Sequence, residues 1–207
     1  MSQRLLSLSL YRWQPESPVE LCGNYELSFL GRFHQRPFRE NLRFQSRLLA
    51  GRTPVGARRC VSILDVGQCH AWVHPDGIAA AAVVAGDYPQ RAVHALLTQA
   101  VRAFSDDMAG QWQDLVADKE LRCTAVDKLF RNFQNPQEAD KLTKLQCDLD
   151  EVKESVIESM GQLLNRGEQL ETLINKSKDL SESSKQFRRM AEKNNSCFEW
   201  IKRLFFA

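Results

Sequence analysis

The sequence predicts an α+β domain followed by a long α-helix of the coiled-coil type. Up to about residue 110, short apolar runs typical of strands alternate with two amphipathic helical stretches. From about residue 140 a single helical repeat replaces this mixed pattern. Between the two regions lies NFQNPQEADKLTK, whose Pro136 interrupts any helix that arrives from upstream. The sequence therefore predicts two structural regions joined by a linker.

The first region contains five strand-like stretches and two helical ones. In chain order, the strand candidates are LLSLSLYRW, PVELCGNYEL, RRCVSILDV, CHAWVHP and GIAAAAVVAG. The helical stretches RPFRENLRFQSRLLAGR and YPQRAVHALLTQAVRAF repeat their apolar residues at helical spacing. The order is strand, strand, helix, three strands, helix. It predicts a five-stranded antiparallel sheet with flanking helices.

Composition and charge exclude several classes of function. A formal net charge of +2 over 207 residues gives no strong field, so we expect no nucleic acid partner. The six cysteines form no CxxC pair and no metal-ligand spacing, which fits reduced thiols in the cytosol. His70 and His74 lie near Cys69, which could suggest a metal site, but along a strand they lie too far apart to share one ion. We expect core or surface histidines, no metal, no cofactor and no enzymatic activity.

The second region carries an apolar seam whose positions alternate strictly between spacings of three and four. Such a helix forms a rod of roughly 75 Å at about 1.5 Å per residue. A rod of this length cannot bury its seam wholly against one small domain, so it requires partner helices. The seam consists of Leu142, Leu145, Leu149, Val152, Val156, Ser159, Leu163, Arg166, Leu170, Leu173, Ser177, Leu180, Ser184, Phe187 and Ala191.

Arg166 is the charged residue at the middle of this seam. Burying a guanidinium in a packed seam has a large desolvation cost unless partner side chains hydrogen-bond to it. The spacing therefore favours a buried polar layer over an exposed arginine on a solvated face. Ser177 and Ser184 also occupy seam positions. They are either small filling residues or phosphorylation sites whose added charge would prevent packing.

The repeat with one central arginine resembles the R-SNARE motif, and the first region is similar to a longin domain. The strings FQNPQEADKLTK, DYPQRAVHALL, LLNRGEQLETLINKS and NNSC resemble the lipid-anchored longin-type R-SNARE that has no transmembrane segment. The resemblance covers nearly the whole chain. It divides the chain into a longin domain at 1–130, a linker at 131–140, an R-SNARE coiled-coil motif at 141–195 and an atypical tail at 196–207.

The resemblance implies a role in vesicle–target membrane fusion. In this family one R-SNARE helix joins three glutamine-bearing SNARE helices in a parallel four-helix bundle, where Arg166 would hydrogen-bond the three glutamines. The family also implies a closed form, in which the motif folds back on a longin groove near Phe44, and disassembly machinery as a further partner. Phe44 is otherwise a core residue of its helix. The implied transport steps are ER–Golgi, Golgi and endosomal or vacuolar.

The carboxy-terminal tail departs from the family pattern. Cys197 matches the first of two adjacent cysteines of a prenylation box, but Phe198 replaces the second. Cys197 is therefore either unmodified or singly lipidated, and the aromatic and basic residues after it could lie in a membrane interface. We expect a cytoplasmic protein with a fraction on the cytosolic face of Golgi, endosomal or vacuolar membranes. The alternative is a longin and coiled-coil adaptor, or a regulatory isoform, without fusion activity.

Overall fold

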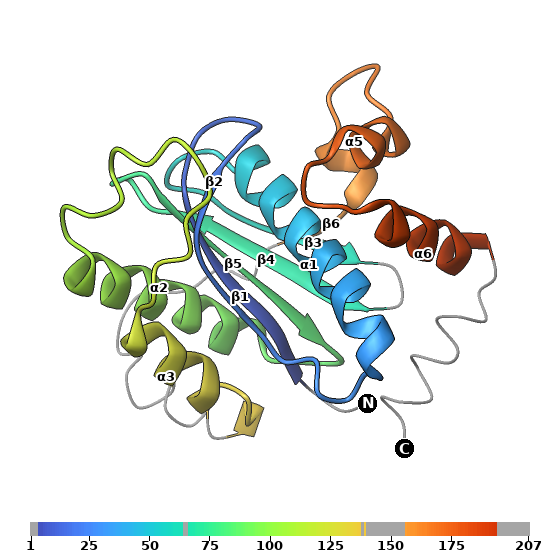
Figure 1. Cartoon of the computed structure of the whole chain (residues 1–207). Coiled ribbons are helices and arrows are strands. Elements are labelled where there is room, and N and C mark those ends of the chain that lie inside the picture. Colours follow the sequence, from blue (N-terminus) through green and yellow to red (C-terminus); the bar gives the residue numbers. More distant parts are fainter. Residues whose placement is uncertain (1–3, 64–65, 138, 140–155, 194–207) are drawn as a thin grey trace.

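The computed structural model describes residues 4–63, 66–137, 139 and 156–193. One mixed sheet organises them, in the strand order β2-β1-β5-β4-β3-β6 (Figure 1). The first five strands pair antiparallel throughout, whereas β6 runs parallel to β3. The predicted α+β class is confirmed, with one strand more than predicted. The strands are β1 (Arg4–Arg12), β2 (Val19–Tyr25), β3 (Arg58–Ile63), β4 (Gly67–Val73), β5 (Ile78–Ala85) and β6 (Ile157–Ser159).

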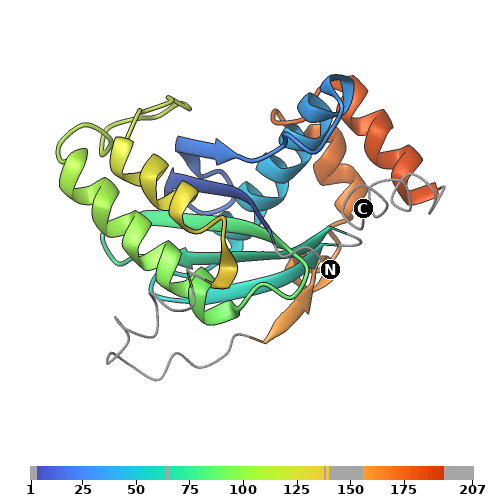
Figure 2. The ribbon, with the colours of Figure 1, turned by 90° about the horizontal axis from the view of Figure 1, so that it is seen from below.

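Two layers of helices sandwich this sheet. Helix α1 (Arg32–Arg52) covers one face, while α2 (Gln90–Asp107) and α3 (Thr124–Asn132) cover the opposite face (Figure 2). Strand β5 lies inside the sheet and is buried along its whole length, because small alanines on both faces let the helices approach closely. Helix α3 is an element that the sequence analysis does not predict.

Strand β1 shows how a bulge alters the expected alternation of side chains. Leu8 and Leu10 belong to the core under α2, as their spacing of two requires. Leu6 belongs instead to the core under α1, because the register between β1 and β5 shifts between Leu5 and Ser7. Both faces of β1 are buried, which suits a strand covered by helices on each side.

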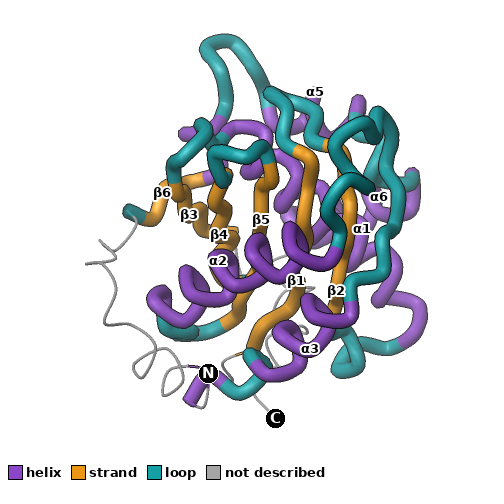
Figure 3. Tube along the Cα trace, turned by 90° about the vertical axis from the view of Figure 1, so that its left-hand side faces the viewer, coloured by secondary structure: helices purple, strands orange, loops and turns teal. Residues whose placement is uncertain are grey.

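Residues 156–193, called the C-terminal segment below, lie along α1 and the outer edge of β3 (Figure 3). They form β6, a 3₁₀ turn η1 (Met160–Leu163), α5 (Leu170–Lys176) and α6 (Glu182–Lys193). The described part of the repeat thus differs from the continuous helix predicted for 141–195. Part of the seam here is buried against the sheet domain rather than against partner helices, and the breaks between elements let it follow that surface.

Candidate functional site

The candidate site is the surface on which the C-terminal segment packs. It begins at the edge of the sheet, where Ile157 to Ser159 pair with Cys60 to Ser62 in parallel register. The backbone makes this contact, and the side chains of the strand and of the residue before it remain largely exposed to solvent. Ile157 is 45% exposed and Val156 is 81% exposed. The free edge of β3 thereby gains a partner strand, which satisfies backbone groups that would otherwise face solvent.

Apolar residues of the repeat continue the contact along α1. Leu163 is buried in the core formed by α1 and the sheet, and Phe187 packs against the same cluster. Further along, Phe44 of α1 forms a small separate cluster with Ile174 and Leu180, each of them about 5% exposed. The structure thus brings the predicted groove residue Phe44 together with part of the predicted seam.

A cavity of about 370 Å³ remains between the segment and the sheet domain. It is open on one side, and its wall is mainly apolar. The segment therefore covers the apolar groove beside α1 without filling it. The large apolar residues that line the cavity are Phe38, Leu42, Ile63, Val66, Met160, Leu170 and Phe187.

Glu40 of α1 fastens the start of α6 by hydrogen bonds. One oxygen of its carboxylate accepts hydrogen bonds from the Ser181 backbone N–H at 2.8 Å and from the Ser184 hydroxyl at 2.7 Å. Partial burial raises the pKa of this carboxyl, but the hydrogen bonds from both serines and from Arg36 outweigh it and lower the pKa to about 2. The carboxylate is therefore ionised at neutral pH and acts as a strong acceptor for the segment.

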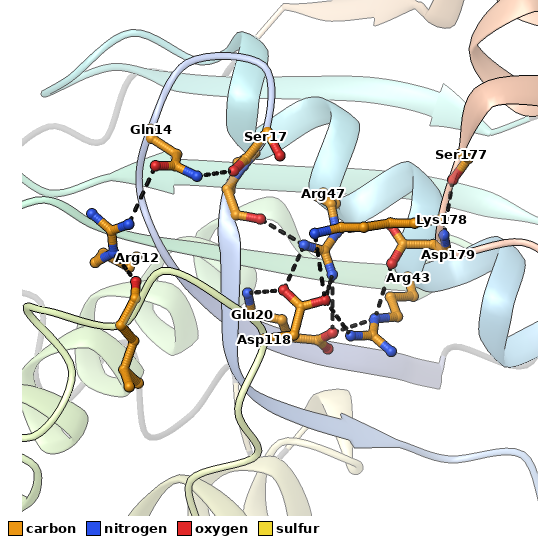
Figure 4. A network of polar contacts seen from close by, with 12 residues as sticks. Arg12, Gln14, Ser17, Glu20, Arg43, Arg47, Asp118, Ser177, Lys178 and Asp179 are labelled. Carbon is orange, nitrogen blue, oxygen red and sulfur yellow. Dashed lines mark hydrogen bonds and ion pairs between the residues drawn. The ribbon is translucent and has the colours of Figure 1, made fainter.

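A network of ion pairs joins the sheet domain to Asp179 of the segment (Figure 4). Arg47 of α1 makes a bidentate pair with Asp118, both contacts being 2.9 Å, and also lies 2.7 Å from Asp179. Arg43, one turn earlier, contacts Glu20 of β2 and lies 3.3 Å from Asp179. The network therefore connects α1, β2, the loop before α3 and the C-terminal segment.

A second arginine pair holds the turn before α5. Arg52, at the end of α1, donates two hydrogen bonds to Glu168, at 2.9 and 3.0 Å. Glu168 also accepts a hydrogen bond from the backbone N–H of Asn165, and this bond closes the turn. Arg166 lies in this turn, exposed, next to Gly167 with its φ of +88°. The seam arginine thus faces solvent in this arrangement.

The other predicted site residues divide by their environment. Of the seam, Leu163, Leu180 and Ser184 are buried, Leu170, Leu173, Ser177 and Phe187 are partly buried, and Val156 and Ser159 are exposed. Ala191 lies in α6. Leu142, Leu145, Leu149, Val152 and the lipidation candidate Cys197 lie outside the described residues.

Sequence reasoning missed the polar contacts of this surface. Arg43 and Arg47 stand four apart on α1, which is a helical signal that they share a face. Their acidic partners lie in three different parts of the chain, and no spacing marks them. The missed residues are Glu20, Glu40, Arg43, Arg47, Arg52, Asp118, Glu168 and Asp179.

His70 and His74 lie apart from this surface. His70 is buried on β4, where its Nε2 lies 3.6 Å from the Cys60 sulfur. His74 is partly exposed, with its Nδ1 3.2 Å from Asp76. Among the residues that the structure describes, no cluster of three or more histidines, cysteines or carboxylates is arranged to hold a metal ion. Within the same residues, no helix is both long enough and apolar enough to span a bilayer.

The chain is similar to known proteins along nearly its full length. Residues 141–205 match the family model described as synaptobrevin. Over 201 residues the chain is 35% identical to the putative synaptobrevin homolog YKT6 of Dictyostelium discoideum, covering 96% of this chain and 100% of that protein. It is 32% identical over 196 residues to the VAMP-like protein YKT61 of Arabidopsis thaliana, covering 94% and 98%. It is 28% identical over 197 residues to the synaptobrevin homolog YKT6 of Eremothecium gossypii, with the same coverage.

Proposed function

Since the chain belongs to the longin-type R-SNARE family, as a synaptobrevin homologue of the Ykt6 kind, we propose that it donates one helix to a four-helix fusion bundle. The role in vesicle fusion follows from the family. The proposal adds that three glutamine-bearing helices complete the bundle and that Arg166 faces their glutamines. The motif spans 141–195, after a longin domain at 1–130 and a linker at 131–140, and the tail follows at 196–207.

The observation that carries this proposal is the position of Arg166. Seam residues before and after it, such as Leu163 and Leu180, are buried against the sheet domain, whereas Arg166 is exposed. A guanidinium kept in water has no desolvation cost, so the folded-back arrangement tolerates it without a partner. In a bundle the same position would be packed, and three glutamine side chains supply the acceptors that it then requires.

We infer that the folded-back arrangement acts as a closed form that opposes assembly. Leu163, Leu180 and Phe187 contact the sheet domain, so they cannot face partner helices at the same time. The ion-pair network is compatible with release of the segment from the sheet domain. Without Asp179, Arg43 and Arg47 retain Glu20 and Asp118, so two positive charges still face two carboxylates. Opening therefore leaves neither Arg43 nor Arg47 without a carboxylate partner.

Assembly with partners tests the proposal directly. The purified chain is mixed with three glutamine-bearing SNARE helices, and helix content is followed by circular dichroism. We expect a gain of helix only in the mixture, because the seam requires partner surfaces. Arg166→Gln should lower the stability of the complex by about one to a few kcal/mol. Arg189→Gln, in the same motif but off the seam, is the matched control.

Two outcomes would contradict this assignment. If Arg166→Gln leaves the thermal stability of the complex unchanged, the arginine does not occupy a packed layer. If the chain forms a helical dimer alone and ignores the partner helices, it is an adaptor whose longin domain binds another protein. This adaptor, or a regulatory isoform without fusion activity, is the second candidate.

The proposal extends to the place of action. We infer palmitate on Cys197 and reversible attachment to the cytosolic face of Golgi, endosomal or vacuolar membranes, with roles in ER–Golgi, Golgi and endosomal or vacuolar transport. SNARE disassembly machinery would return the chain to its closed form. Support comes from the family alone, so the direct check is mass spectrometry of the carboxy-terminal peptide isolated from cells. An unmodified Cys197 in the membrane fraction would contradict the lipid assignment.

A further inference from the structure

The first two turns of α1 present an unusual combination of side chains to solvent. Phe33 is 93% exposed, the highest exposure among the large apolar residues that the structure describes. Arg32, Arg36 and Arg39 are exposed around it. From residue 32 to residue 39 the helix carries no acidic side chain. An exposed aromatic ring in the same two turns as three guanidinium groups suits a partner that is both anionic and apolar.

Helical geometry places these residues on one side of α1. Arg32, Arg36 and Arg39 follow one another at spacings of four and three, so they line a single stripe. Phe38 and Leu42 lie on the other side of the helix, buried at 3% and 2% exposure in the core above the sheet. The stripe lies outside this core: Arg32 and Arg36 are exposed, and Arg39 lies over Tyr25 at the end of β2.

Local partners leave the arginines available. Arg36 pairs with Glu40 at 2.9 Å, but its side chain is 79% exposed, and exposed pairs of this kind contribute little energy. Arg39 lies 5.2 Å from the centre of the Tyr25 ring and remains exposed. Arg39 also lines a hollow that contains Glu20, Asp118 and Glu120, but among the described residues the ion pair made by these three arginines is the one between Arg36 and Glu40.

The same end of α1 lies beside the last described helix. Helix α6 packs along the N-terminal half of α1, and the rings of His34 and Phe187 are 6.1 Å apart (Figures 1 and 2). Helix α6 ends at Lys193. Cys197 follows four residues later, within at most about 14 Å of chain. A membrane contacted by Cys197 or by the tail after it would therefore lie close to this end of the sheet domain.

We propose that Arg32, Phe33, Arg36 and Arg39, the α1 tip, form a docking surface for an anionic lipid bilayer. The arginines face lipid phosphates, which guanidinium groups bind by charged hydrogen bonds, and the Phe33 ring enters the interfacial region. A single acyl chain gives only marginal attachment, and stable anchoring requires a second signal. The α1 tip supplies such a signal from the folded domain. This contact does not depend on the four-helix bundle.

Vesicle binding by the full-length, unmodified chain tests the proposal. The probes are vesicles of phosphatidylcholine alone and of phosphatidylcholine mixed with phosphatidylserine. We expect binding only to the mixed vesicles, and weaker binding at higher salt. The triple variant Arg32→Gln, Arg36→Gln, Arg39→Gln should lose about fivefold in partition coefficient for each arginine removed. Phe33→Ser should reduce the remaining binding further. All four side chains are exposed, so the fold should survive.

Matched controls lie outside the α1 tip. Arg102→Gln, Arg122→Gln and Arg131→Gln together remove the same charge from exposed positions, and Val116→Ser removes an apolar residue that is 86% exposed. These variants should bind mixed vesicles as the wild type does.

Several results would overturn the proposal. One is equal binding of the wild type to neutral and mixed vesicles. Another is an undiminished affinity of the α1-tip variants, which would assign membrane binding to the tail. An equal loss in the control variants would show that only net charge matters. Binding of soluble polyglutamate, but not of vesicles, would assign the surface to an acidic protein partner instead.

Discussion

The sheet domain and the C-terminal segment bury apolar side chains to very different extents. Every residue of β5 is buried, and α2 places its apolar face against a fully enclosed core. In the segment, Leu163 and Leu180 are buried, while Leu170 and Leu173 are only partly covered and Val156 is exposed. Apolar residues on both faces of a strand can be satisfied only inside a layered domain. A single helical seam can be satisfied by any complementary surface, including that of partner helices.

This comparison predicts that the contact of the segment can be broken without unfolding the domain. Phe44 contacts the segment through Ile174 and Leu180, so Phe44→Glu places a carboxylate in an apolar cluster and should release the segment. The same substitution at the exposed Phe33 is the matched control. We expect a larger hydrodynamic radius for Phe44→Glu only, with the thermal unfolding of the sheet domain nearly unchanged.

A second variant excludes the possibility that a new ion pair keeps the segment bound. The Arg188 guanidinium lies 5.8 Å from the centre of the Phe44 ring, and it could pair with an introduced glutamate. Phe44→Ala offers no such partner and should weaken the closed arrangement by about 3–5 kcal/mol, because the cluster loses its largest member. Equal radii for the wild type and both Phe44 variants would show that this cluster does not hold the segment.

The sequence predicts the sheet domain more completely than the segment. Strands β1 to β5 and helices α1 and α2 follow from periodicity and turn signals, because each element meets one environment along its length. Strand β6 could not be predicted in this way, since its last residue, Ser159, fits the helical seam as well as it fits an edge strand. The charged contacts are the least predictable part. Glu20, Asp118 and Asp179 meet around Arg47 only after the whole chain has folded.

Lowering the pH should reduce the unfolding free energy of the sheet domain. Burial, and then the nearby His94, lower the pKa of His70 to about 3, so the folded domain keeps this imidazole neutral. The unfolded chain takes up the proton below about pH 6.5. The stabilisation is therefore complete above that pH and is lost as the pH falls towards 3. His70 alone predicts a loss of about 2 kcal/mol in unfolding free energy between pH 7 and pH 5.

Urea unfolding at the two pH values measures this loss. His70→Asn should remove about 2 kcal/mol of the pH dependence, because the unfolded variant no longer takes up that proton. Some dependence should remain from His94, whose pKa burial lowers to about 4. His74→Asn, at the partly exposed surface position, should keep the dependence of the wild type. A His70 variant with unaltered pH dependence would show that this imidazole is not held neutral.

The smallest expected effect concerns Glu40, which fastens the start of α6 through Ser181 and Ser184. Glu40→Gln keeps an acceptor oxygen but removes its charge, so closure should weaken by about 1 kcal/mol. Because closure lowers the pKa of Glu40 to about 2, closure should also weaken as acid protonates this carboxylate between about pH 4.5 and 2 in the wild type, but not in Glu40→Gln.

Hydrogen exchange of the Ser184 amide, which donates to the Ser181 carbonyl, reports closure locally at neutral pH. We expect roughly fivefold faster exchange in Glu40→Gln. Glu26→Gln changes a carboxylate bonded to Ser28 within the sheet domain, and should leave this amide unaffected. Equal protection in both variants would mean that apolar contacts alone hold the segment in place.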